Sequence, residues 1–568
     1  MENFVLAIEY FVGIIVFALL NLYIYDRFVQ RKSSLLASYP IIGRFRYLFE
    51  ILREPFKQYF GDEKFYETRD KIDWVYKASH DAPNFLSFSV SQSFHGTRFI
   101  IKNANKVLNN EEVSDDFSVT FGRNLKMPFK SKSIIARSGM SDGALSPEAT
   151  RAFALGAKNG NFPINTGEGG LTSNYFFGYK PNEHELGCME IVEGSEFQKT
   201  MFKITRKLFN GAVATKLYRK FALNNKLQDT YIMNLDDLSF FRPNWDAPVE
   251  KFPKEVPTEL PDMILQVGSG LYGVRDKEGN FDPERYQKVM SFCRMTEVKI
   301  AQGAKQTGGK IIGSKVTHDI AYYRGVEPYK DLMSPNRFPY ANTLDELFDF
   351  IGQLQELSGK PVGMKIVISD KENTEDIVSK INERIKEKKA IPNFITVDAG
   401  DGGSATAPLE LMETVGLNAV NSLYLIDRML RNYGIRDELK LIISGKILTP
   451  DDIAILMCLG ADMTAIARGF MMSGGCIRAR QCSGTSGHPC PVGMATQDKK
   501  KRAAYMVLRK ASHITFYHNN LLKGIKTLQA VMGVSNIKDL SKKNLAFKNK
   551  QGEIYFDIEK YFHHKLDV

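Results

Sequence analysis

The sequence predicts a (β/α)8 barrel, a TIM barrel of the α/β class, preceded by one N-terminal transmembrane helix. Two observations predict this architecture. Eight short apolar runs lie between residues 133 and 469, and helical patterns follow most of them. An apolar segment of bilayer-spanning length lies at the N-terminus. Alternating buried strands and helices indicate a parallel sheet, and eight strands over about 340 residues favour a barrel over an open doubly wound sheet.

The N-terminal segment, residues 4–25, reads FVLAIEYFVGIIVFALLNLYIY and is apolar except for Glu9 and Asn21. About twenty such residues span a bilayer core as a helix. No basic residue precedes the segment and no small-residue cleavage site follows it, which favours a retained anchor over a signal peptide. A buried core helix is the alternative. The basic residues after the segment predict a single-pass protein of the cytoplasmic (inner) membrane whose remaining chain faces the cytoplasm. They are Arg27, Arg31, Lys32, Arg44 and Arg46.

The chain divides into four predicted regions. Residues 1–32 form the anchor, and residues 33–116 form a juxtamembrane segment whose fold the pattern does not predict. The barrel covers residues 117–510, and residues 511–568 form a C-terminal helical extension. The net charge of +11 over 568 residues is modest, and we find no long basic tract with interleaved aromatic residues, so nucleic-acid binding is not expected.

The carboxyl ends of the eight apolar runs are rich in Ser, Gly, Asp, Lys and Gln residues. Barrels carry their catalytic and cofactor-binding groups at the carboxyl ends of the strands, so these residues mark the candidate site. The runs are SIIARSGM (133–140), NFPINTGEGG (161–170), MILQVGSG (263–270), EVKIAQG (297–303), VGMKIVIS (362–369), NFITVDAG (393–400), LKLIISG (439–445) and MTAIARG (463–469). Amphipathic helices between them include residues 343–359, 374–390 and 449–460.

One run contains a GxGxxG pattern at Gly268, Gly270 and Gly273. A charged turn follows it instead of a helix, and no carboxylate is evidently placed to hold a ribose. We therefore predict a tight turn at a strand end and not a dinucleotide site.

The seventh and eighth runs end in Ser444-Gly445-Lys446 and Ala467-Arg468-Gly469. Backbone amides after these two strands commonly bind a phosphate group in barrels, and FMN would place its phosphate there. Lys365 lies inside an apolar run. It either points into the barrel mouth towards an anionic or electron-rich partner, or it pairs with a buried acid.

Five segments, taken together, carry a family resemblance. SGMSDGALSPEATRAFALGAKNGNFPINTGEGG (138–170), QVGSGLYGV (266–274), VKIAQGAKQTGGKIIGSKVTHDIAYYRG (298–325), DAGDGGSATAP (398–408) and the segment 466–498, with CPVGMATQD near its end, occur in this order. They resemble the FMN-binding domain of glutamate synthase over about residues 117–510. The chain is similar to the stand-alone, membrane-anchored members of that family.

The resemblance implies an oxidoreductase of the class that acts on CH–NH2 groups. Reduced FMN would deliver a hydride to 2-iminoglutarate, formed from 2-oxoglutarate and ammonia, to give L-glutamate. Lys305 and Arg324 match positions that hold the two carboxylates of 2-oxoglutarate, although solvated surface pairs are the alternative. Glu168 matches the position that couples ammonia delivery to the flavin site. The implied catalytic residues are Glu168, Gln266 and Lys365. The implied FMN-binding residues are Ser141, Gln266, Lys365, Gly402, Gly403, Gly445, Ala467, Arg468 and Gly469.

The sequence departs from the family pattern in one substrate loop. QGAKQTGGKIIG is one residue shorter than its counterpart, and Lys310 replaces a substrate-contacting Gln, so Lys310 is also a candidate substrate-binding residue. No N-terminal cysteine nucleophile, glutaminase domain or nicotinamide domain is evident. We therefore expect ammonia from solution or a partner, and an external electron donor such as a ferredoxin or a reductase subunit.

Three of the six cysteines lie within fifteen residues: Cys476, Cys482 and Cys490. Their spacing is C-x5-C-x7-C, whereas the family's C-x5-C-x4-C loop ligates a 3Fe–4S iron–sulfur cluster. The extra residues could form a loop that leaves the ligands in place, since thiolates are the usual cluster ligands. Structural thiols and a nucleophilic Cys476 are the alternatives.

Two further functional interpretations remain open at this stage. The chain could act on another 2-oxo acid or imine, because Lys310 and the shortened loop alter the substrate site. It could also be a membrane-tethered electron-transfer subunit without turnover of its own.

Overall fold

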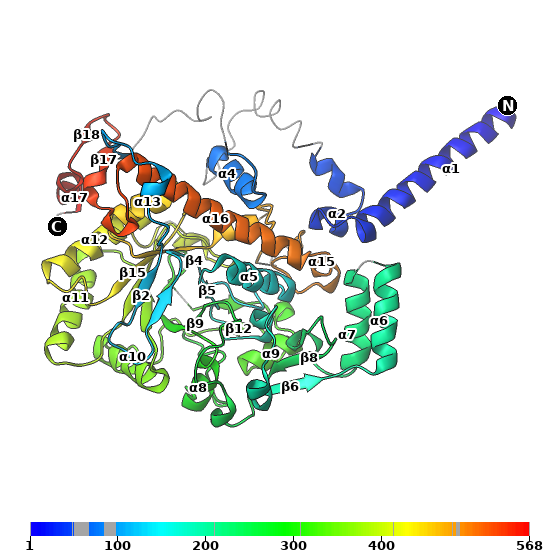
Figure 1. Cartoon of the computed structure of the whole chain (residues 1–568), viewed down its shortest axis with the longest axis horizontal. Coiled ribbons are helices and arrows are strands. Elements are labelled where there is room, and N and C mark those ends of the chain that lie inside the picture. Colours follow the sequence, from blue (N-terminus) through cyan, green and yellow to red (C-terminus); the bar gives the residue numbers. More distant parts are fainter. Residues whose placement is uncertain are drawn as a thin grey trace.

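The computed structural model describes residues 2–47, 49, 68–84, 98–209, 211–306, 308–412, 414–479, 481–483 and 489–566. A closed barrel of eight parallel strands forms its centre (Figure 1). All eight predicted runs supply strands, which confirms the fold class. Around the barrel the strands are β4 (Ile135–Arg137), β5 (Ile164–Asn165), β9 (Met263–Val267), β10 (Met295–Lys299), β13 (Val362–Ile366), β14 (Phe394–Asp398), β15 (Lys440–Ser444) and β16 (Met463–Ile466), and β16 pairs with β4.

Side chains alternate between the barrel interior and the surrounding helices along each strand. On β10, Val298 packs into the large core cluster of the helix layer, whereas Met295 belongs to a separate cluster inside the barrel. The same alternation turns Glu297 and Lys299 inward, above Met295. The interior is therefore apolar near the start of the strands and polar near their ends.

An antiparallel hairpin closes the amino-terminal end of the barrel. It consists of β2 (Val119–Phe121) and β3 (Phe129–Ser131). The rings of Phe121 and Phe394 meet edge to face with centroids 5.6 Å apart. This end of the barrel is thus sealed by apolar contacts, and the opposite end carries the polar groups.

Helices surround the barrel, and most begin at a side-chain cap. Ser146, Thr343 and Asp370 each accept a hydrogen bond from a backbone amide in the first turn of the helix that follows. The layer comprises α5 (Pro147–Gly160), α8 (Pro283–Met290), α9 (His318–Arg324), α10 (Leu344–Ser358), α11 (Lys371–Lys386), α12 (Ala419–Asn432), α13 (Pro450–Cys458) and α14 (Arg468–Ser473). The long α16 (Val507–Met532) packs against α5, α13 and α4 (Arg69–Ser79), and the short α15 (Lys499–Arg502) precedes it.

The N-terminal helix α1 (Glu2–Ile24) extends away from the barrel (Figure 1). The stretch Ile8–Val29 is long and apolar enough to cross a bilayer, and none of its most apolar window is buried, so it is not a core helix. A compact turn follows, containing α2 (Ser34–Ser38), in which Arg44 pairs with the buried Asp26 at 2.6 Å. Lys501 of α15 lies over the ring of Tyr39, 3.2 Å from its centroid, and joins this turn to the barrel layer.

Segments that precede and follow the barrel in the sequence share a small sheet. β1 (Arg98–Ile101) pairs antiparallel with β17 (Leu545–Lys548), which also pairs with β18 (Ile554–Tyr555). The helix α17 (Ile558–Leu566) follows. The C-terminal region thus adds two strands to the helices expected there. Much of the juxtamembrane segment, residues 50–67 and 85–97, lies outside the described residues.

A subdomain between β5 and β9 was not anticipated. It contains the antiparallel sheet of β6 (Met189–Val192), β7 (Ile232–Met233) and β8 (Phe240–Pro243), and a helical hairpin of α6 (Glu196–Leu208) and α7 (Gly211–Leu223). The ring of Tyr218 on α7 packs against those of Phe202 and Phe240, at centroid distances of 5.2 and 5.4 Å. Figure 1 shows the hairpin at the edge of the molecule.

Candidate active site at the barrel mouth

A buried carboxylate organises the upper interior of the barrel. Glu297 accepts hydrogen bonds from Asn165 Nδ2 at 2.8 Å, from Gln266 Nε2 at 2.6 Å and from the hydroxyl of Thr396. Glu297, Asn165, Thr396 and Lys365 line a small cavity in the barrel. The side chain of Gln266 is therefore fixed in the interior, below the mouth.

Lys365 lies beside this group on β13 and pairs with Asp398 at the end of β14, at 3.4 Å. Burial opposes the charge on Lys365, but Asp398 and Glu297 outweigh it and raise the pKa of the ammonium group. Asp398 also accepts from the amide of Gly303 at 2.9 Å and from the hydroxyl of Ser444. Lys365 therefore pairs with a buried acid near the strand ends, and its contact with an anionic or electron-rich partner stays a prediction.

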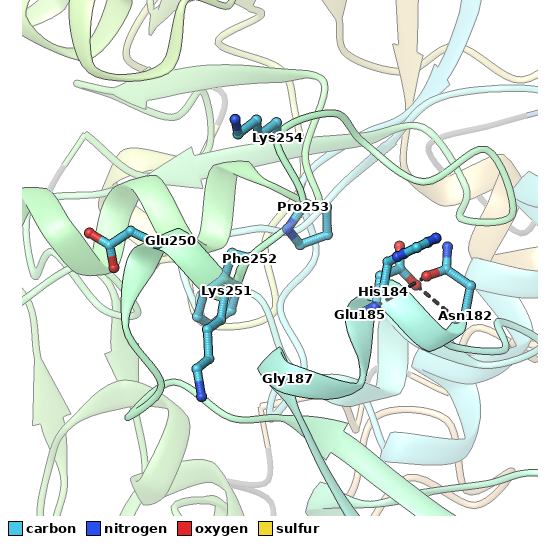
Figure 2. Close-up of a pocket in the computed structure, with 9 residues that line it drawn as sticks. All are labelled: Asn182, His184, Glu185, Gly187, Glu250, Lys251, Phe252, Pro253 and Lys254. Carbon is cyan, nitrogen blue, oxygen red and sulfur yellow. Dashed lines mark hydrogen bonds between the residues drawn. The ribbon is translucent and has the colours of Figure 1, made fainter.

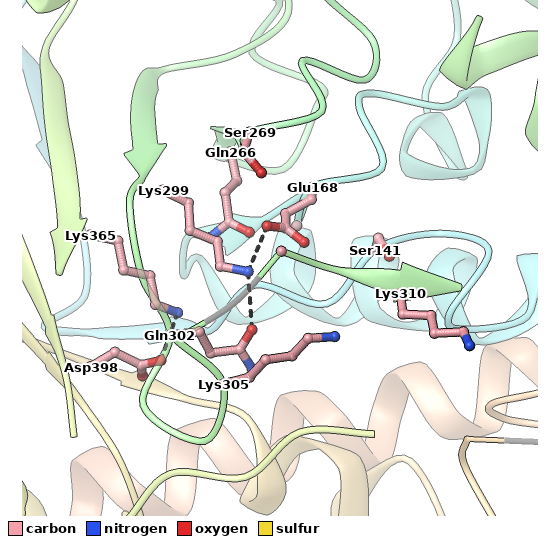
Figure 3. A network of polar contacts seen from close by, with 12 residues as sticks. Ser141, Glu168, Gln266, Ser269, Lys299, Gln302, Lys305, Lys310, Lys365 and Asp398 are labelled. Carbon is pink, nitrogen blue, oxygen red and sulfur yellow. Dashed lines mark hydrogen bonds and ion pairs between the residues drawn. The ribbon is translucent and has the colours of Figure 1, made fainter. Parts of the chain in front are cut away.

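A second ion pair lies at the mouth, between the loop after β5 and the end of β10. Lys299 Nζ donates to Glu168 Oε1 at 2.6 Å and to Gln302 Oε1 at 3.0 Å (Figure 3). Burial opposes ionisation of Glu168, yet Lys299 first, and then Arg324 and Lys365, lower the pKa of this carboxyl group. Glu168 is therefore held as an anion among cations.

The two lysines of the loop after β10 have different environments. Lys305 is buried, and its Nζ lies 3.3 Å from the hydroxyl of Thr406. Burial, then the charge of Lys299, lowers the pKa of Lys305. Lys310, on β11 (Lys310–Ile311), is half exposed and lies 3.8 Å from Asp331. Lys305 is thus a buried cation near the mouth and not part of a surface pair. Lys310 is a solvated cation at the edge of the mouth.

Arg324 is the last residue of α9, which ends at Gly325 in the left-handed region (φ 66°). Its Nη2 donates to the carbonyl of Asp142 at 3.0 Å and lies 3.4 Å from Ser141 Oγ. The guanidinium is 2% exposed, and no described residue accepts a hydrogen bond from Nε. Burial lowers the pKa of Arg324. A buried guanidinium with an unused donor suits an anionic ligand.

Glycines bring the backbone close together at the ends of β14, β15 and β16. Gly445 has φ +135°, and a Cβ there would lie 2.5 Å from the Cβ of Ala399. A Cβ on Gly403 would lie 3.0 Å from Nη2 of Arg468, so the guanidinium rests against this loop. Gly402 donates its amide to Ala399. At Gly469 a Cβ would collide with the hydroxyl of Tyr517, so packing against α16 explains that glycine.

The GxGxxG run forms the tight turn expected of it. Leu271 N donates to the carbonyl of Gly268 at 2.9 Å, and Gly273 has φ +87°. A Cβ on Gly170 would lie 2.7 Å from Gly273 Cα, so this turn packs directly on the NTGEGG loop. The turn thereby supports the loop that carries Glu168.

The cysteine loop lies beside the barrel, next to α4. Cys490 is buried, and Cys476 and Cys482 are partly buried. Burial first, then the neighbouring thiols, raises the pKa of Cys476 to about 12, which disfavours a nucleophilic role for the free thiol. Tyr76 donates to the carbonyl of Cys476 at 2.7 Å, and Lys315 donates to that of Cys482. Among the described residues, which exclude 484–488 in this loop, no metal-binding group of His, Cys, Asp or Glu is found.

Four residues of the site were missed from the sequence: Glu297, Lys299, Gln302 and Asp398. The signal was present in EVK, because two charged residues at alternate positions of a buried strand point to the same side. A surface pocket between residues 182–187 and 250–254 contains none of the predicted site residues (Figure 2). It lies in the subdomain between β5 and β9.

Comparisons with known proteins bear on this arrangement. The family model described as the conserved region in glutamate synthase matches residues 90–535. The chain is 29% identical to the glutamate synthase large subunit-like protein YerD of Bacillus subtilis, over 99% of both chains. It is 29% identical to the archaeal-type glutamate synthase [NADPH] of Dehalococcoides mccartyi, over 49% of this chain and 52% of that protein.

Other matches are more partial. The ferredoxin-dependent glutamate synthase of Cyanidium caldarium is 28% identical over 50% of this chain, and the match spans only 17% of that protein. A solved structure of a flavocytochrome b2 mutant with benzoylformate matches at a TM-score of 0.40, with 12% identity over 91% of this chain and 90% of that one. The barrel assignment therefore rests on the strand pairing of the chain itself. By the extent of the family match, this chain belongs to the family defined by the conserved region of glutamate synthase.

Proposed function

We propose that this protein is an FMN-dependent oxidoreductase of the glutamate synthase type, which converts 2-oxoglutarate and ammonia to L-glutamate through 2-iminoglutarate. One observation carries the proposal. In a chain of this family, four cations converge around Glu168 at the carboxyl end of the barrel. Figure 3 shows three of them, Lys299, Lys305 and Lys365, and the fourth, Arg324, interacts with the Glu168 carboxylate electrostatically.

The residues at the barrel mouth fit FMN. Crowded glycines at the ends of β14 and β15 allow close approach of the backbone, and the Arg468 guanidinium beside Gly403 suits a phosphate group. Lys365, Gln266, Ser141 and the turn at Ala467 would hold the rest of the group. Bound FMN would supply the hydride. Lys365, whose ammonium group is buried and paired with Asp398, would supply positive charge to the bound group.

The cations at the mouth fit a dicarboxylate. Arg324 has an unused Nε donor, and Lys305 is a second, separate cation. Two cations at different points would fix both ends of 2-oxoglutarate and orient its C2 carbon. Burial strengthens both contacts, because little water competes with the ligand there.

Glu168 suits the handling of ammonia. Its carboxylate is held ionised by Lys299 and would accept hydrogen bonds from ammonium. Its Oε2 would accept these hydrogen bonds, since Oε1 is engaged by Lys299. The nitrogen would thereby be held beside the carbonyl carbon bound by Lys305 and Arg324.

An iron–sulfur cluster, an external electron donor and a membrane anchor complete the proposal. We propose that Cys476, Cys482 and Cys490 hold a 3Fe–4S cluster, supported by the match of the family model to residues 90–535, which include this loop. As they stand in the described structure, the three thiols do not form a metal-binding group. An external donor, a ferredoxin or a reductase subunit, would supply electrons. The helix over Ile8–Val29 would hold the protein in the cytoplasmic membrane with the barrel on the cytoplasmic side.

The experiment begins with anaerobically purified full-length protein. The released flavin should be FMN, and the photoreduced protein given 2-oxoglutarate and ammonium should form glutamate. Arg324→Ala should weaken 2-oxoglutarate binding at least about a hundredfold, because a buried charged contact is lost. Arg275→Ala, which removes a nearby guanidinium with a more exposed hydrogen bond, is the matched control.

The outcomes separate the parts of the proposal. Protein that takes up no FMN on reconstitution contradicts the flavin assignment. Unchanged 2-oxoglutarate affinity in Arg324→Ala contradicts the substrate assignment. Paramagnetic resonance of the oxidised protein tests the cluster independently, because a 3Fe–4S centre gives a signal that FMN does not.

A second candidate substrate is another 2-oxo acid or imine, and Lys310 favours it. This side chain is a half-exposed cation at the edge of the mouth and could reach a longer or differently charged acid. Product analysis across a set of 2-oxo acids distinguishes the two. Turnover without any partner protein would exclude a purely electron-transferring subunit.

A further inference from the structure

The hairpin of α6 and α7 carries an exposed apolar stripe that the fold does not use. Phe197, Met201, Ile204 and Leu208 recur at i, i+4, i+7 and i+11, so they share one face of α6. They are 75%, 44%, 45% and 73% exposed. Phe209, just after α6, is 60% exposed. An apolar stripe of this length on a surface helix indicates a contact with something outside the chain.

The stripe is not needed to hold the hairpin on the sheet of its subdomain. Phe202, Ala214 and Tyr218 do that from the inner faces of the two helices, and all three are buried. Tyr218 also donates to the carbonyl of Leu238 at 2.7 Å. On α7, Leu217 and Phe221 are 43% and 61% exposed and extend the apolar surface to the second helix.

The charge on the hairpin is strongly one-sided. Residues 195–226 contain eight Lys or Arg residues and one Glu. Lys199 pairs with Glu196 and Glu193, and Lys226 pairs with Glu190. Five other cations of the hairpin are exposed and have no ion-pair partner among the described residues. They are Lys203, Arg206, Lys207, Lys216 and Lys220.

The position of the hairpin indicates which partner it meets. Along the long axis of the molecule, α6 and α7 lie at the end from which α1 emerges (Figure 1). The basic helix α15 (KKKR) lies at the same end, and its Lys501 contacts the turn after α1. A bilayer that contains α1 would therefore lie on the side of the hairpin.

We propose that the α6–α7 hairpin is a second membrane contact, which lies in the interface of an anionic bilayer. The apolar stripe would enter the boundary between headgroups and acyl chains, and the unpaired cations would bind acidic lipid headgroups. The barrel would then be held against the membrane at two points. This inference goes beyond the proposed function; it rests on the membrane anchor proposed there and not on the flavin or substrate assignments.

The test uses the full chain reconstituted into vesicles of phosphatidylcholine and phosphatidylglycerol with brominated acyl chains. Phe197→Trp reports on the hairpin, and Phe556→Trp is the matched control, because Phe556 is 72% exposed in the C-terminal region. The native Trp74 and Trp245 give a background that the unsubstituted chain measures. We expect about a twofold quenching of the emission of Trp introduced at position 197, since interfacial residues lie within reach of the acyl chains. We expect none at 556.

A charge-reversed pair tests the lipid preference. Lys203→Glu together with Lys207→Glu, in the Phe197→Trp background, should abolish the quenching, whereas Lys543→Glu with Lys550→Glu should leave it unchanged. Vesicles of phosphatidylcholine alone should give little quenching, and so should high salt, because surface attraction is screened.

Three results would overturn the proposal. Quenching at position 197 no greater than at 556 would show that the hairpin does not enter the bilayer. Equal quenching in neutral and anionic vesicles would contradict the proposed contact with acidic lipid headgroups. If the Trp emission at position 197 changed only when an acidic protein such as a ferredoxin was added, the surface would be assigned to a protein partner instead.

Discussion

The two ends of the barrel interior differ although the same strands build them. On β10, Met295 packs in the apolar lower cluster, and Glu297, two residues later, accepts three hydrogen bonds in the polar layer. On β14, Phe394 and Asp398 show the same change. A shift of two to four residues along a strand therefore separates a position that stabilises the fold from one that prepares a binding site.

The energetic difference follows from the chemistry of each end. Burial of Phe394 and its neighbours removes apolar surface from water and stabilises the barrel. Burial of Glu297 and Lys365 costs desolvation free energy, which the ion pair and hydrogen bonds offset in part. The carboxyl end of the barrel thus adds little to the free energy of unfolding and holds charged groups in place for a ligand. Four predictions test this contrast.

The largest expected effect is at the sealed end. Phe394→Ala removes a ring that packs on Phe121 and should lower the free energy of unfolding by about 3–5 kcal/mol. Phe556→Ala removes the same ring from an exposed position and should change it by less than about 0.5 kcal/mol. Denaturant midpoints of both variants in detergent give the measurement. Equal effects would mean that the lower cluster is not a cohesive core.

The second prediction concerns the stability of the protein at low pH and the helix α16, which packs beside the start of β4. His518 of α16 is 1% exposed, lies 2.8 Å from Ser133 Oγ and stacks on Phe162. Burial lowers its pKa to about 4, below the ordinary value near 6.5, so the folded protein holds the ring neutral. Its contribution to stability is present above pH 6.5 and is lost as pH falls towards 4, by up to about 3 kcal/mol.

Thermal midpoints between pH 7.5 and 4.5 measure this loss. His518→Gln should be less stable than the parent at pH 7.5, and the gap should narrow as the pH falls. A gap that is constant with pH would show that His518 does not titrate in this range.

The third prediction addresses the polar layer. Glu297→Gln replaces one carboxylate oxygen by an NH2 group. Asn165, Gln266 and Thr396 all donate to this carboxylate, so at least one of them then faces another donor and loses its acceptor. We expect a loss of about 1–3 kcal/mol in unfolding free energy. Turnover should fall as well, because Lys365 then lacks one of its buried anions. Full stability and full turnover would contradict an organising role for Glu297.

The smallest effect is expected at the rim. Lys310→Gln should raise the KM for 2-oxoglutarate by no more than about fivefold, because a half-exposed cation is well screened. Lys305→Gln, which removes a buried cation, should raise it much more. Steady-state kinetics on the two variants make the comparison. A larger effect for Lys310 would place it on the substrate and favour a different acid.

The sequence predicted the barrel and the end that carries the site, because buried parallel strands leave continuous apolar runs and their ends leave Gly, Ser, Asp and Lys. It did not reveal the ion pair of Lys299 with Glu168, since these residues come from different strand ends and meet only when the barrel closes. It did not reveal the α6–α7 hairpin as a unit, because an amphipathic pattern shows which face of a helix is apolar but not which element packs against that face. The predicted FMN and substrate roles, the cluster and the membrane location stay predictions.

The pairing of β1 with β17 has a consequence for how the protein is made. Residues 98–101 find their strand partner at residues 545–548, which leave the ribosome after all eight barrel strands. The barrel strands are complete by residue 466, so they can associate while the tail is still being synthesised. Until β17 arrives, β1 presents an unpaired edge, and such an edge is open to pairing with another chain. Nascent chains truncated before residue 545 should therefore aggregate although every barrel strand is present.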